Sequence, residues 1–188
     1  MVINVARTLP KSSANGPGDR YVLWVQGCPL ACPGCWNPDT WSFKRKDLRT
    51  INEVAEDIRG TRGIEGVTFT GGEPFAQAGA LSLLARTIKE SGLSVFIFTG
   101  FTLPELKEPE HLRLLECADI LVTGRYIESL RSADLPWRGS SNQEVHFLSN
   151  RYGPESMIGA PVIEFHLNPG SPNSITGFPI EVEWRSPL

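Results

Sequence analysis

Three of the four cysteines lie close together: Cys28, Cys32 and Cys35 are separated by three residues and then by two. Three thiolates at this spacing can reach three corners of one iron–sulfur cube. A conventional [4Fe–4S] site takes four cysteines, so three leave one iron without a protein ligand. An open coordination position is where a metal site can bind a substrate. We therefore expect these three cysteines to be the metal ligands of a [4Fe–4S] cluster.

Two other interpretations of the cysteine loop remain open. A structural zinc site needs a fourth ligand, and Cys117 and the three histidines have no local ligand spacing. A thioredoxin-like redox pair fits Cys32-Pro-Gly-Cys35, but that motif begins a helix. Here Pro38 follows closely and disfavours helix in the residue before it. Cys117 lies in an apolar stretch, which predicts a buried structural cysteine.

A second candidate site is the phrase Gly71-Gly72-Glu73-Pro74, which follows an apolar strand pattern. The carboxyl end of such a strand is where α/β proteins bind ligands. Glycines allow the main chain to approach a ligand closely. The Glu73 carboxylate can accept hydrogen bonds from a ligand ammonium group. An ordinary strand–helix turn explains the phrase equally well when it is taken alone.

Strands alternate with helices over most of the chain. The patterns predict strands at residues 21–25, 66–70, 94–98 and 120–122, and helices at residues 50–62, 77–91 and 110–117. This alternation implies parallel strand pairing through helical crossovers. The units are too few for a closed eight-stranded barrel. We therefore expect an α/β fold that forms an open, partial barrel.

The C-terminal segment has a different pattern. Apolar and polar residues alternate at 163–167 and at 180–184, and the residues between them are rich in Asn, Pro, Gly and Ser. This pattern predicts a C-terminal β-hairpin that closes the edge of the sheet. We expect a single domain over residues 1–188, with a core at about 14–150 and a C-terminal extension at about 151–188.

The composition narrows the possible partners. Of 188 residues, 40% are hydrophobic and 21% are charged, as in folded globular domains. The net charge of −3 argues against a nucleic-acid partner. No apolar stretch is long enough to span a bilayer, and the first ten residues do not resemble a secretory signal. We expect a cytoplasmic protein with no nucleic-acid or membrane partner.

The cysteine loop matches the C-x3-C-x2-C signature of radical S-adenosylmethionine (SAM) enzymes, and Gly71-Gly72-Glu73 resembles their motif for the SAM amino group. More narrowly, residues 14–148 resemble the activating enzymes of anaerobic (class III) ribonucleotide reductase. That likeness rests on the phrases Gly16-Pro17-Gly18-Asp19-Arg20, Gln26-Gly27-Cys28, Cys35-Trp36-Asn37, Thr40-Trp41, Thr99-Gly100-Phe101 and Trp137-Arg138-Gly139-Ser140-Ser141-Asn142-Gln143.

Three positions depart from the family pattern. Gly34 stands where radical SAM enzymes generally carry an aromatic residue, and Trp36 follows the third cysteine instead. Glu73 replaces an aspartate that is common in the activating enzymes. The chain after Asn150 has no clear counterpart in the short activating enzymes. This last departure concerns the substrate and leaves the cluster unaffected.

The resemblance implies a [4Fe–4S] cluster with one open iron, and SAM bound to that iron. An electron from flavodoxin or ferredoxin would split SAM into methionine and a 5′-deoxyadenosyl radical. The radical would remove a Cα hydrogen from a glycine of a large glycyl radical enzyme, such as anaerobic ribonucleotide reductase. The cofactor-binding residues that it implies are Gly34, Cys35, Trp36, Asn37, Gly71, Gly72 and Glu73. It implies no catalytic residue beyond the cluster and SAM.

Two alternatives to this function remain. One is a stand-alone radical SAM enzyme that modifies a peptide or a small molecule, with the C-terminal extension shaping its pocket. The other is a structural zinc or iron–sulfur module. Residues 137–143 follow the fourth predicted strand, so we expect this loop to border the opening of the partial barrel. Arg20 follows a Gly-Pro-Gly phrase, and we expect it to lie on the surface rather than to neutralise a carboxylate.

Overall fold

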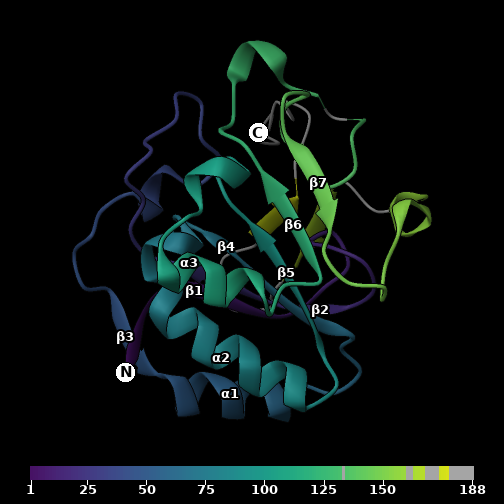
Figure 1. The fold of residues 1–188 in the computed structure, drawn as a ribbon. Coiled ribbons are helices and arrows are strands. Elements are labelled where there is room, and N and C mark those ends of the chain that lie inside the picture. The colour runs from purple at the N-terminus through teal and green to yellow at the C-terminus, as the bar shows by residue number, and fades with distance from the viewer. Residues whose placement is uncertain (133, 160–162, 168–173, 178–188) are drawn as a thin grey trace, which may run out of the picture.

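The computed structural model describes residues 1–132, 134–159, 163–167 and 174–177 (Figure 1). Within these residues a seven-stranded sheet has the strand order β3-β1-β2-β4-β5-β6-β7. Its strands are β1 (Val2–Ser12), β2 (Arg20–Val25), β3 (Asp47–Thr50), β4 (Gly66–Gly71), β5 (Ser94–Phe98), β6 (Ile120–Thr123) and β7 (Glu144–Phe147). The fold is therefore mixed α/β, as the sequence predicts.

The α-helices are α1 (Ile51–Gly60), α2 (Ala78–Glu90) and α3 (Pro109–Leu115). Short 3-10 turns are η1 (Pro38–Thr40), η2 (Pro74–Gln77), η3 (Leu103–Glu105), η4 (Glu128–Leu130) and η5 (Pro154–Met157). Local signals explain the helix ends. Thr50 and Glu53 form a capping box at the start of α1, and Gly92, at a φ of +79°, follows the end of α2. The three helices predicted from the sequence are confirmed.

The four central strands, β2, β4, β5 and β6, pair in parallel, as predicted. Three further strands were not expected from the sequence. β1 pairs antiparallel with β2 and β3, and β7 pairs antiparallel with β6. Register shifts interrupt the pairing of β1 between Val5 and Arg7 and between Leu9 and Ser12. Such irregularities break the period-two pattern by which a strand is recognised.

The two faces of the sheet have separate cores. Leu23, Phe69 and Ile97 are fully buried in the core that includes side chains of α1 and α2. On the other face Phe96 packs with Trp137. Figure 1 shows the helices gathered along one side of the sheet. The face that carries Phe96 is packed by β7 and by residues of later loops, among them Trp137 and Tyr152.

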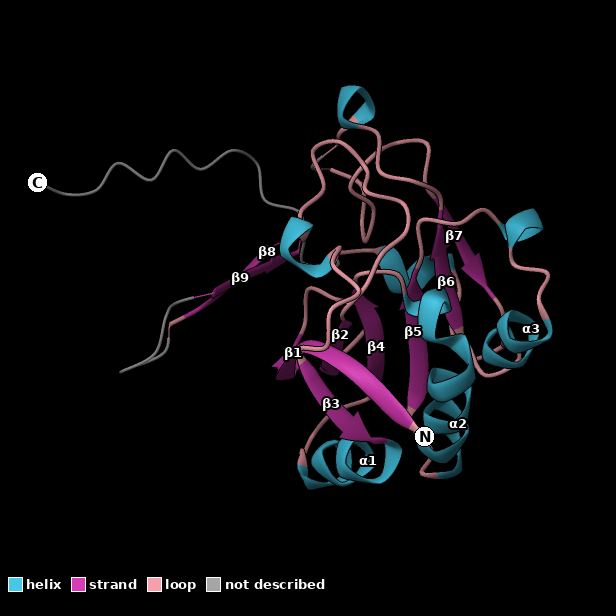
Figure 2. Ribbon diagram, turned by 90° about the vertical axis from the view of Figure 1, so that its left-hand side faces the viewer, coloured by secondary structure: helices cyan, strands magenta, loops and turns pink. Residues whose placement is uncertain are grey.

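The C-terminal segment forms a separate sheet of two antiparallel strands, β8 (Ile163–His166) and β9 (Ser174–Gly177). Figure 2 shows these strands beside β1 and away from β6 and β7. The strand predicted at residues 180–184 lies outside the described residues. β8 instead pairs with β9, whose residues lie in the stretch that was expected to form the loop between the two predicted strands. β7 instead borders β6, because Val145 and Phe147 pack into the second core.

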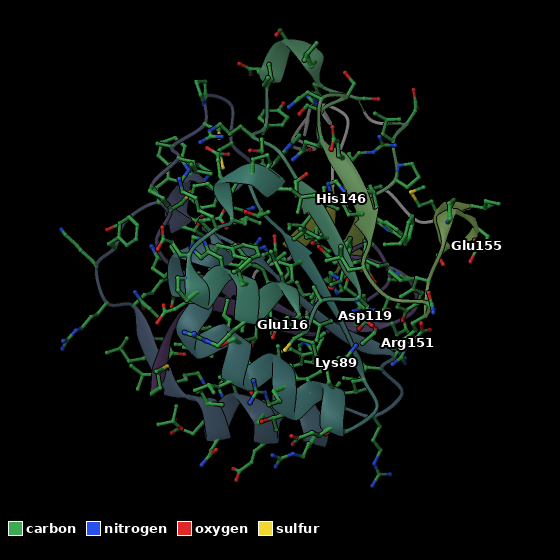
Figure 3. The ribbon with its side chains drawn as sticks, in the orientation of Figure 1. Lys89, Glu116, Asp119, His146, Arg151 and Glu155 are labelled. Carbon is green, nitrogen blue, oxygen red and sulfur yellow. The ribbon has the colours of Figure 1, made fainter. Side chains whose placement is uncertain are left out.

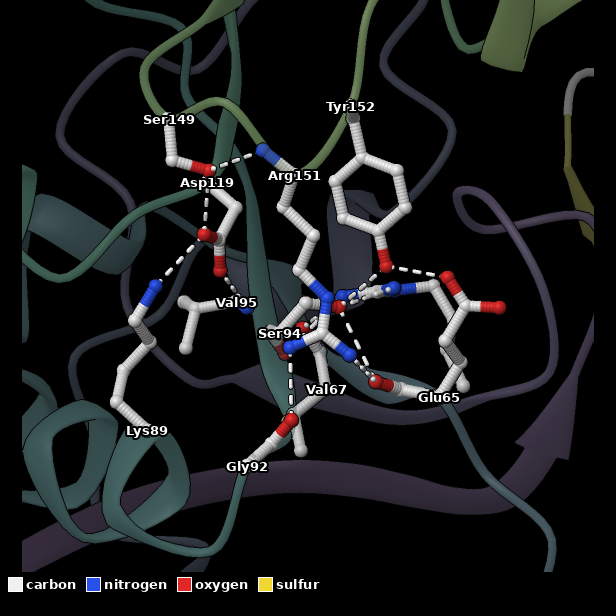
Figure 4. Close-up of polar contacts among 11 residues, drawn as sticks. Glu65, Val67, Lys89, Gly92, Ser94, Val95, Asp119, Ser149, Arg151 and Tyr152 are labelled. Atoms are coloured by element: carbon white, nitrogen blue, oxygen red, sulfur yellow. Dashed lines mark hydrogen bonds and ion pairs between the residues drawn. The ribbon is translucent and has the colours of Figure 1, made fainter.

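The expectation that Arg20 lies on the surface is wrong, since its side chain is fully buried. Its Nε donates to Thr68 Oγ1 (2.8 Å) and its Nη1 to Ser94 Oγ (2.9 Å). The Ser94 hydroxyl also bonds Tyr152 Oη (2.8 Å), and Tyr152 bonds Glu65 (Figure 4). These partners come from separate parts of the chain, so the sequence around Arg20 gives no sign of its burial.

No helix among the described residues is long and apolar enough to cross a membrane.

Candidate functional site

The carboxyl ends of β2, β4 and β5 meet at a cavity of about 330 Å³. Its wall contains the motifs that the sequence singled out, together with the segment after β5. These lining residues are Cys28, Cys32, Cys35, Trp36 and Asn37 after β2, Gly71, Gly72 and Glu73 at the end of β4, and Thr99 and Gly100 after β5. Parallel strands end at one edge of a sheet, so motifs far apart in sequence come together here.

Main-chain hydrogen bonds fix the cysteine loop at both ends. Gly27 N donates to Thr40 O (2.7 Å), and Cys28 N donates to Trp41 O (3.1 Å). Within the loop Cys35 N donates to Cys32 O (3.1 Å). Ala31 has a φ of +44°, a left-handed conformation that is uncommon for a residue other than glycine. The loop is thus tightly constrained around the three thiols, which are partly exposed and unbridged.

The surroundings of Cys28 and Cys32 differ from those of a reactive cysteine. Burial raises the pKa of Cys28, and the nearby Glu73 carboxyl adds to this effect. Burial also raises the pKa of Cys32, with a further contribution from Cys35. A low-pKa redox thiol needs the opposite environment. A bound metal centre removes the thiol proton itself, so these thiols fit ligands better than a redox pair.

The donor set fits an iron–sulfur cluster. Asn37 N lies 3.4 Å from Cys35 Sγ and donates to it, and hydrogen bonds of this kind tune iron–sulfur clusters. Among the described residues no three His, Cys, Asp or Glu side chains converge on a single metal ion. A cube offers its irons at separate corners, so its thiolates need not converge on one point. Cys117 is buried beside α2, with its thiol 3.5 Å from Arg113 O, as predicted.

Both glycines of the Gly-Gly-Glu phrase are required by close packing. Gly71 has a φ of +100°, and a Cβ atom there would lie 2.7 Å from Trp24 Cα. A Cβ atom on Gly72 would collide with Gly27 O. The main chain then bonds directly to the neighbouring strand end, because Gly72 N donates to Val25 O (2.8 Å) and Glu73 N to Gly27 O (2.9 Å). These contacts hold the phrase against the cysteine loop.

Glu73 is 1% exposed. Oε1 accepts hydrogen bonds from Phe75 N (2.9 Å) and Thr99 Oγ1 (2.8 Å), and Oε2 accepts one from Gly100 N (2.9 Å). Burial raises the pKa of Glu73 to about 7, although these three bonds favour the charged form. A carboxylate accepts about four hydrogen bonds, so Oε2 can accept one more. Glu73 therefore both caps η2 and has an acceptor position left at the cavity.

The other predicted residues around the cysteines have distinct roles. Gly34 is absent from the cavity wall, and its φ of +72° and its closeness to Glu128 and Tyr126 indicate a packing role. The Trp36 ring lies edge-on to Tyr126 at a centroid distance of 6.4 Å and is 36% exposed. Trp36 is therefore a half-open wall residue and not part of the core. Asn37 Oδ1 accepts a hydrogen bond from Arg7 Nη2 (3.1 Å).

Sequence reasoning missed several wall residues. Arg7 lies with its guanidinium 4.4 Å from the ring centroid of Trp24, and both residues line the cavity. Asn15 and Tyr126 also contribute to the wall, as do Ile175, Thr176 and Gly177. Arg7 belongs to the irregular strand β1, which had not been predicted, so no local signal indicated its position.

The loop at residues 137–143 borders the cavity, as predicted. Gln143 lines it, accepts a hydrogen bond from Gly139 N (2.8 Å) and donates to Gly124 O (2.9 Å). Asn142 Nδ2 donates to Arg125 O (2.9 Å). These two amides hold the main chain at residues 124–125, directly before Tyr126.

A family model described as a 4Fe-4S single cluster domain matches residues 14–146. The anaerobic ribonucleoside-triphosphate reductase-activating protein of Escherichia coli K12 is 33% identical over 154 residues, which cover 78% of this chain and 99% of that protein. The chain belongs to this family of activating proteins.

Other members of the family show the same degree of likeness. The protein of the same name from Enterobacteria phage T4 is 34% identical over 149 residues, with 76% of this chain and 93% of that protein covered.

The crystal structure of QueE from Escherichia coli has a TM-score of 0.46 and 21% identity over 54% of each chain, which is too distant to bear on function.

Membership identifies the metal centre as a [4Fe–4S] cluster, so the zinc and redox-pair interpretations are no longer needed. The matched region ends at residue 146, before β8 and β9. These two strands are therefore additions to the matched domain, although β9 contributes to the cavity wall.

Proposed function

We propose that the chain is a radical SAM activating enzyme that generates a glycyl radical on a large partner protein. The observation that carries the proposal is the meeting of three half-exposed cysteines and the Glu73 carboxylate at one cavity. The names of the relatives give the partner its class, an anaerobic ribonucleoside-triphosphate reductase.

In this proposal Cys28, Cys32 and Cys35 would hold three irons of the cluster, which leaves the fourth iron without a protein ligand. When bound, the cluster supplies one electron that cleaves SAM to methionine and a 5′-deoxyadenosyl radical, which takes a hydrogen atom from a glycine Cα. The protein orients the reactants and excludes water. The constrained loop and the hydrogen bond from Asn37 N to Cys35 Sγ support this role.

Glu73 would accept a hydrogen bond from the SAM ammonium group through Oε2, which accepts one hydrogen bond from Gly100 N in the structure. Gly71 and Gly72 bring the main chain to the same wall, and Trp36 and Asn37 border the cofactor site. An ionised carboxylate is needed for this contact, and the ligand ammonium group favours that form.

Flavodoxin or ferredoxin supplies the electron from the side of the cysteine loop. The exposed side chains of Lys44, Arg45 and Lys46 suit an acidic donor. We propose further that the sheet forms an open, partial barrel, that residues 1–188 are one domain, and that the enzyme works in the cytoplasm.

A direct test combines the reduced, iron-reconstituted chain and SAM with the large glycyl radical enzyme from the same genome. We expect 5′-deoxyadenosine and a doublet EPR signal located on the partner. Formation of 5′-deoxyadenosine without a partner signal would contradict the activating function.

One observation favours a second candidate, a stand-alone radical SAM enzyme. Ile175, Thr176 and Gly177 line the cavity and belong to a segment outside the matched family region. If this wall closes the cavity to protein segments, the substrate is a small molecule or a short peptide. The same EPR experiment separates the two candidates, because only an activating enzyme transfers the radical to a large protein.

A further inference from the structure

β9 lines the cavity with three consecutive residues, Ile175, Thr176 and Gly177. Successive side chains of a strand point to opposite faces, so side chains alone do not bring three neighbours to one wall. Gly177 has no side chain and contributes only its main chain. The main chain of β9 is therefore part of the cavity wall.

One edge of β9 pairs with β8, and the other edge has no strand partner among the described residues. Its residues pair antiparallel with β8, from Ser174 opposite His166 to Gly177 opposite Ile163. Within the part of the chain that the structure describes, no other strand pairs with β9. Alternate residues of an antiparallel strand direct their N–H and C=O groups to opposite edges. An unpaired edge of this kind is a template for another extended segment.

Hydrogen bonds fix this edge relative to the catalytic wall. Thr176 Oγ1 accepts a hydrogen bond from Asn15 Nδ2 (2.8 Å), and both residues line the cavity. Asn15 O accepts one from Thr68 Oγ1 (2.7 Å) on β4, the strand that carries the Gly-Gly-Glu phrase. Glu164 on β8 bonds Ser12 at the end of β1. The free edge is thus held in place at the cavity.

We propose that β9 binds the partner's target segment by strand addition: an extended, glycine-containing stretch pairs with the free edge of β9 and passes along the cavity. The inference rests on the proposed function. A glycine has no side chain that a binding site could contact. Main-chain pairing is therefore a way to hold the reacting residue itself. Because β8 and β9 follow the matched region, this device belongs to the added C-terminal strands.

The test uses the full, reconstituted chain with SAM and synthetic peptides that span the radical-bearing glycine of the partner. Two peptides carry N-methyl groups on alternate residues, one in each register, and an unmodified peptide is the reference. We expect one of the two methylated peptides to bind at least about tenfold more weakly, because its N-methyl groups replace the N–H groups that would donate to β9. The other peptide should keep its affinity, because its N-methyl groups face away from β9. Equal affinities for the two methylated peptides would overturn the proposal.

Hydrogen exchange with the full-length partner gives an independent readout. We expect amides within residues 174–177 to become protected when the partner binds. A glycyl radical on the partner without this protection would overturn strand addition and leave the activating function intact. Protection without a radical would support strand addition and contradict the activating function.

Discussion

The two ends of the parallel strands use their polar groups in opposite ways. At the amino ends, Arg20, Ser94 and Tyr152 bond one another and neighbouring main-chain groups inside the protein. At the carboxyl ends the cysteine thiols are unbridged and half-exposed, and Glu73 keeps an acceptor position at a cavity. A buried polar group stabilises a fold when its bonds are satisfied, whereas an unsatisfied one is available to a ligand.

Asp119 is an example of a buried polar group at the amino ends of the strands whose hydrogen bonds are satisfied. Its carboxylate accepts hydrogen bonds from Lys89 Nζ (2.6 Å), Ser149 Oγ (2.7 Å) and Val95 N (2.9 Å). Burial by itself would raise the pKa of Asp119, but these bonds outweigh it and hold the pKa below its usual value. Figures 3 and 4 show Lys89 reaching from α2 toward this carboxylate. Glu73, by contrast, has a raised pKa despite three bonds.

The largest effect should follow from removing a cluster ligand at the carboxyl end. We expect Cys28→Ala, Cys32→Ala and Cys35→Ala each to abolish the [4Fe–4S] cluster, because each removes one of three thiolates. Iron and sulfide analysis after anaerobic reconstitution measures this. Cys117→Ala is the matched control and should keep the full content. A complete cluster in any of the first three variants would refute the ligand assignment.

At the amino end, Arg20→Ala should weaken folding. The substitution removes a buried guanidinium and its hydrogen bonds to Ser94 and Thr68, so we expect a loss of about 3 kcal/mol in the free energy of unfolding. Urea denaturation measures the loss. Arg45→Ala, at an exposed position, should change stability by less than about 0.5 kcal/mol. Equal effects in the two variants would mean that the Arg20 network does not stabilise the fold.

A smaller effect is expected from Glu73→Gln, which keeps the size of the side chain but removes its charge. We expect a loss of about 1.5–3 kcal/mol in SAM binding, because a charge-assisted hydrogen bond is weakened. Calorimetry measures the affinity, and iron analysis should show an unchanged cluster. Unchanged SAM affinity would exclude the proposed contact, and a lost cluster would make Glu73 a structural residue.

The pH dependence provides a second readout for Glu73. Because the pKa of Glu73 is raised to about 7, the carboxyl is protonated below that pH and ionised above it. The affinity of the wild-type chain for SAM should therefore rise as the pH increases through about 7. The Glu73→Gln variant should lack this rise.

The raised pKa also means that the contribution of Glu73 to stability is full below pH 4.5 and is lost as the pH rises through about 7.

The smallest effect should come from Thr176→Val, which keeps the shape of the side chain but removes the acceptor for Asn15 Nδ2. We expect about 1 kcal/mol less stability for the attachment of β9, seen as faster hydrogen exchange at residues 174–177. Cluster content should not change. Unaltered exchange would show that this hydrogen bond does not hold the wall.

The elements that position the site could be predicted from the sequence because their signals are local. Apolar runs mark β2, β4 and β5, and the capping box at Thr50 marks the start of α1. The cysteine spacing and the Gly-Gly-Glu phrase identify two walls of the cavity for the same reason. The burial of Arg20 was not predictable, because Thr68 and Ser94 are distant in sequence. β9 was missed because its residues lie in a stretch with the composition of a loop.

The measurement that tests the central claim most directly is deuterium transfer from the partner into 5′-deoxyadenosine. The partner is prepared with α-deuterated glycine and mixed with the reduced, reconstituted chain and SAM. Our account predicts deuterium in the 5′-deoxyadenosine, because the cavity at the carboxyl ends receives the target glycine. Unlabelled 5′-deoxyadenosine, formed at a normal rate in the presence of the partner, would contradict the activating function.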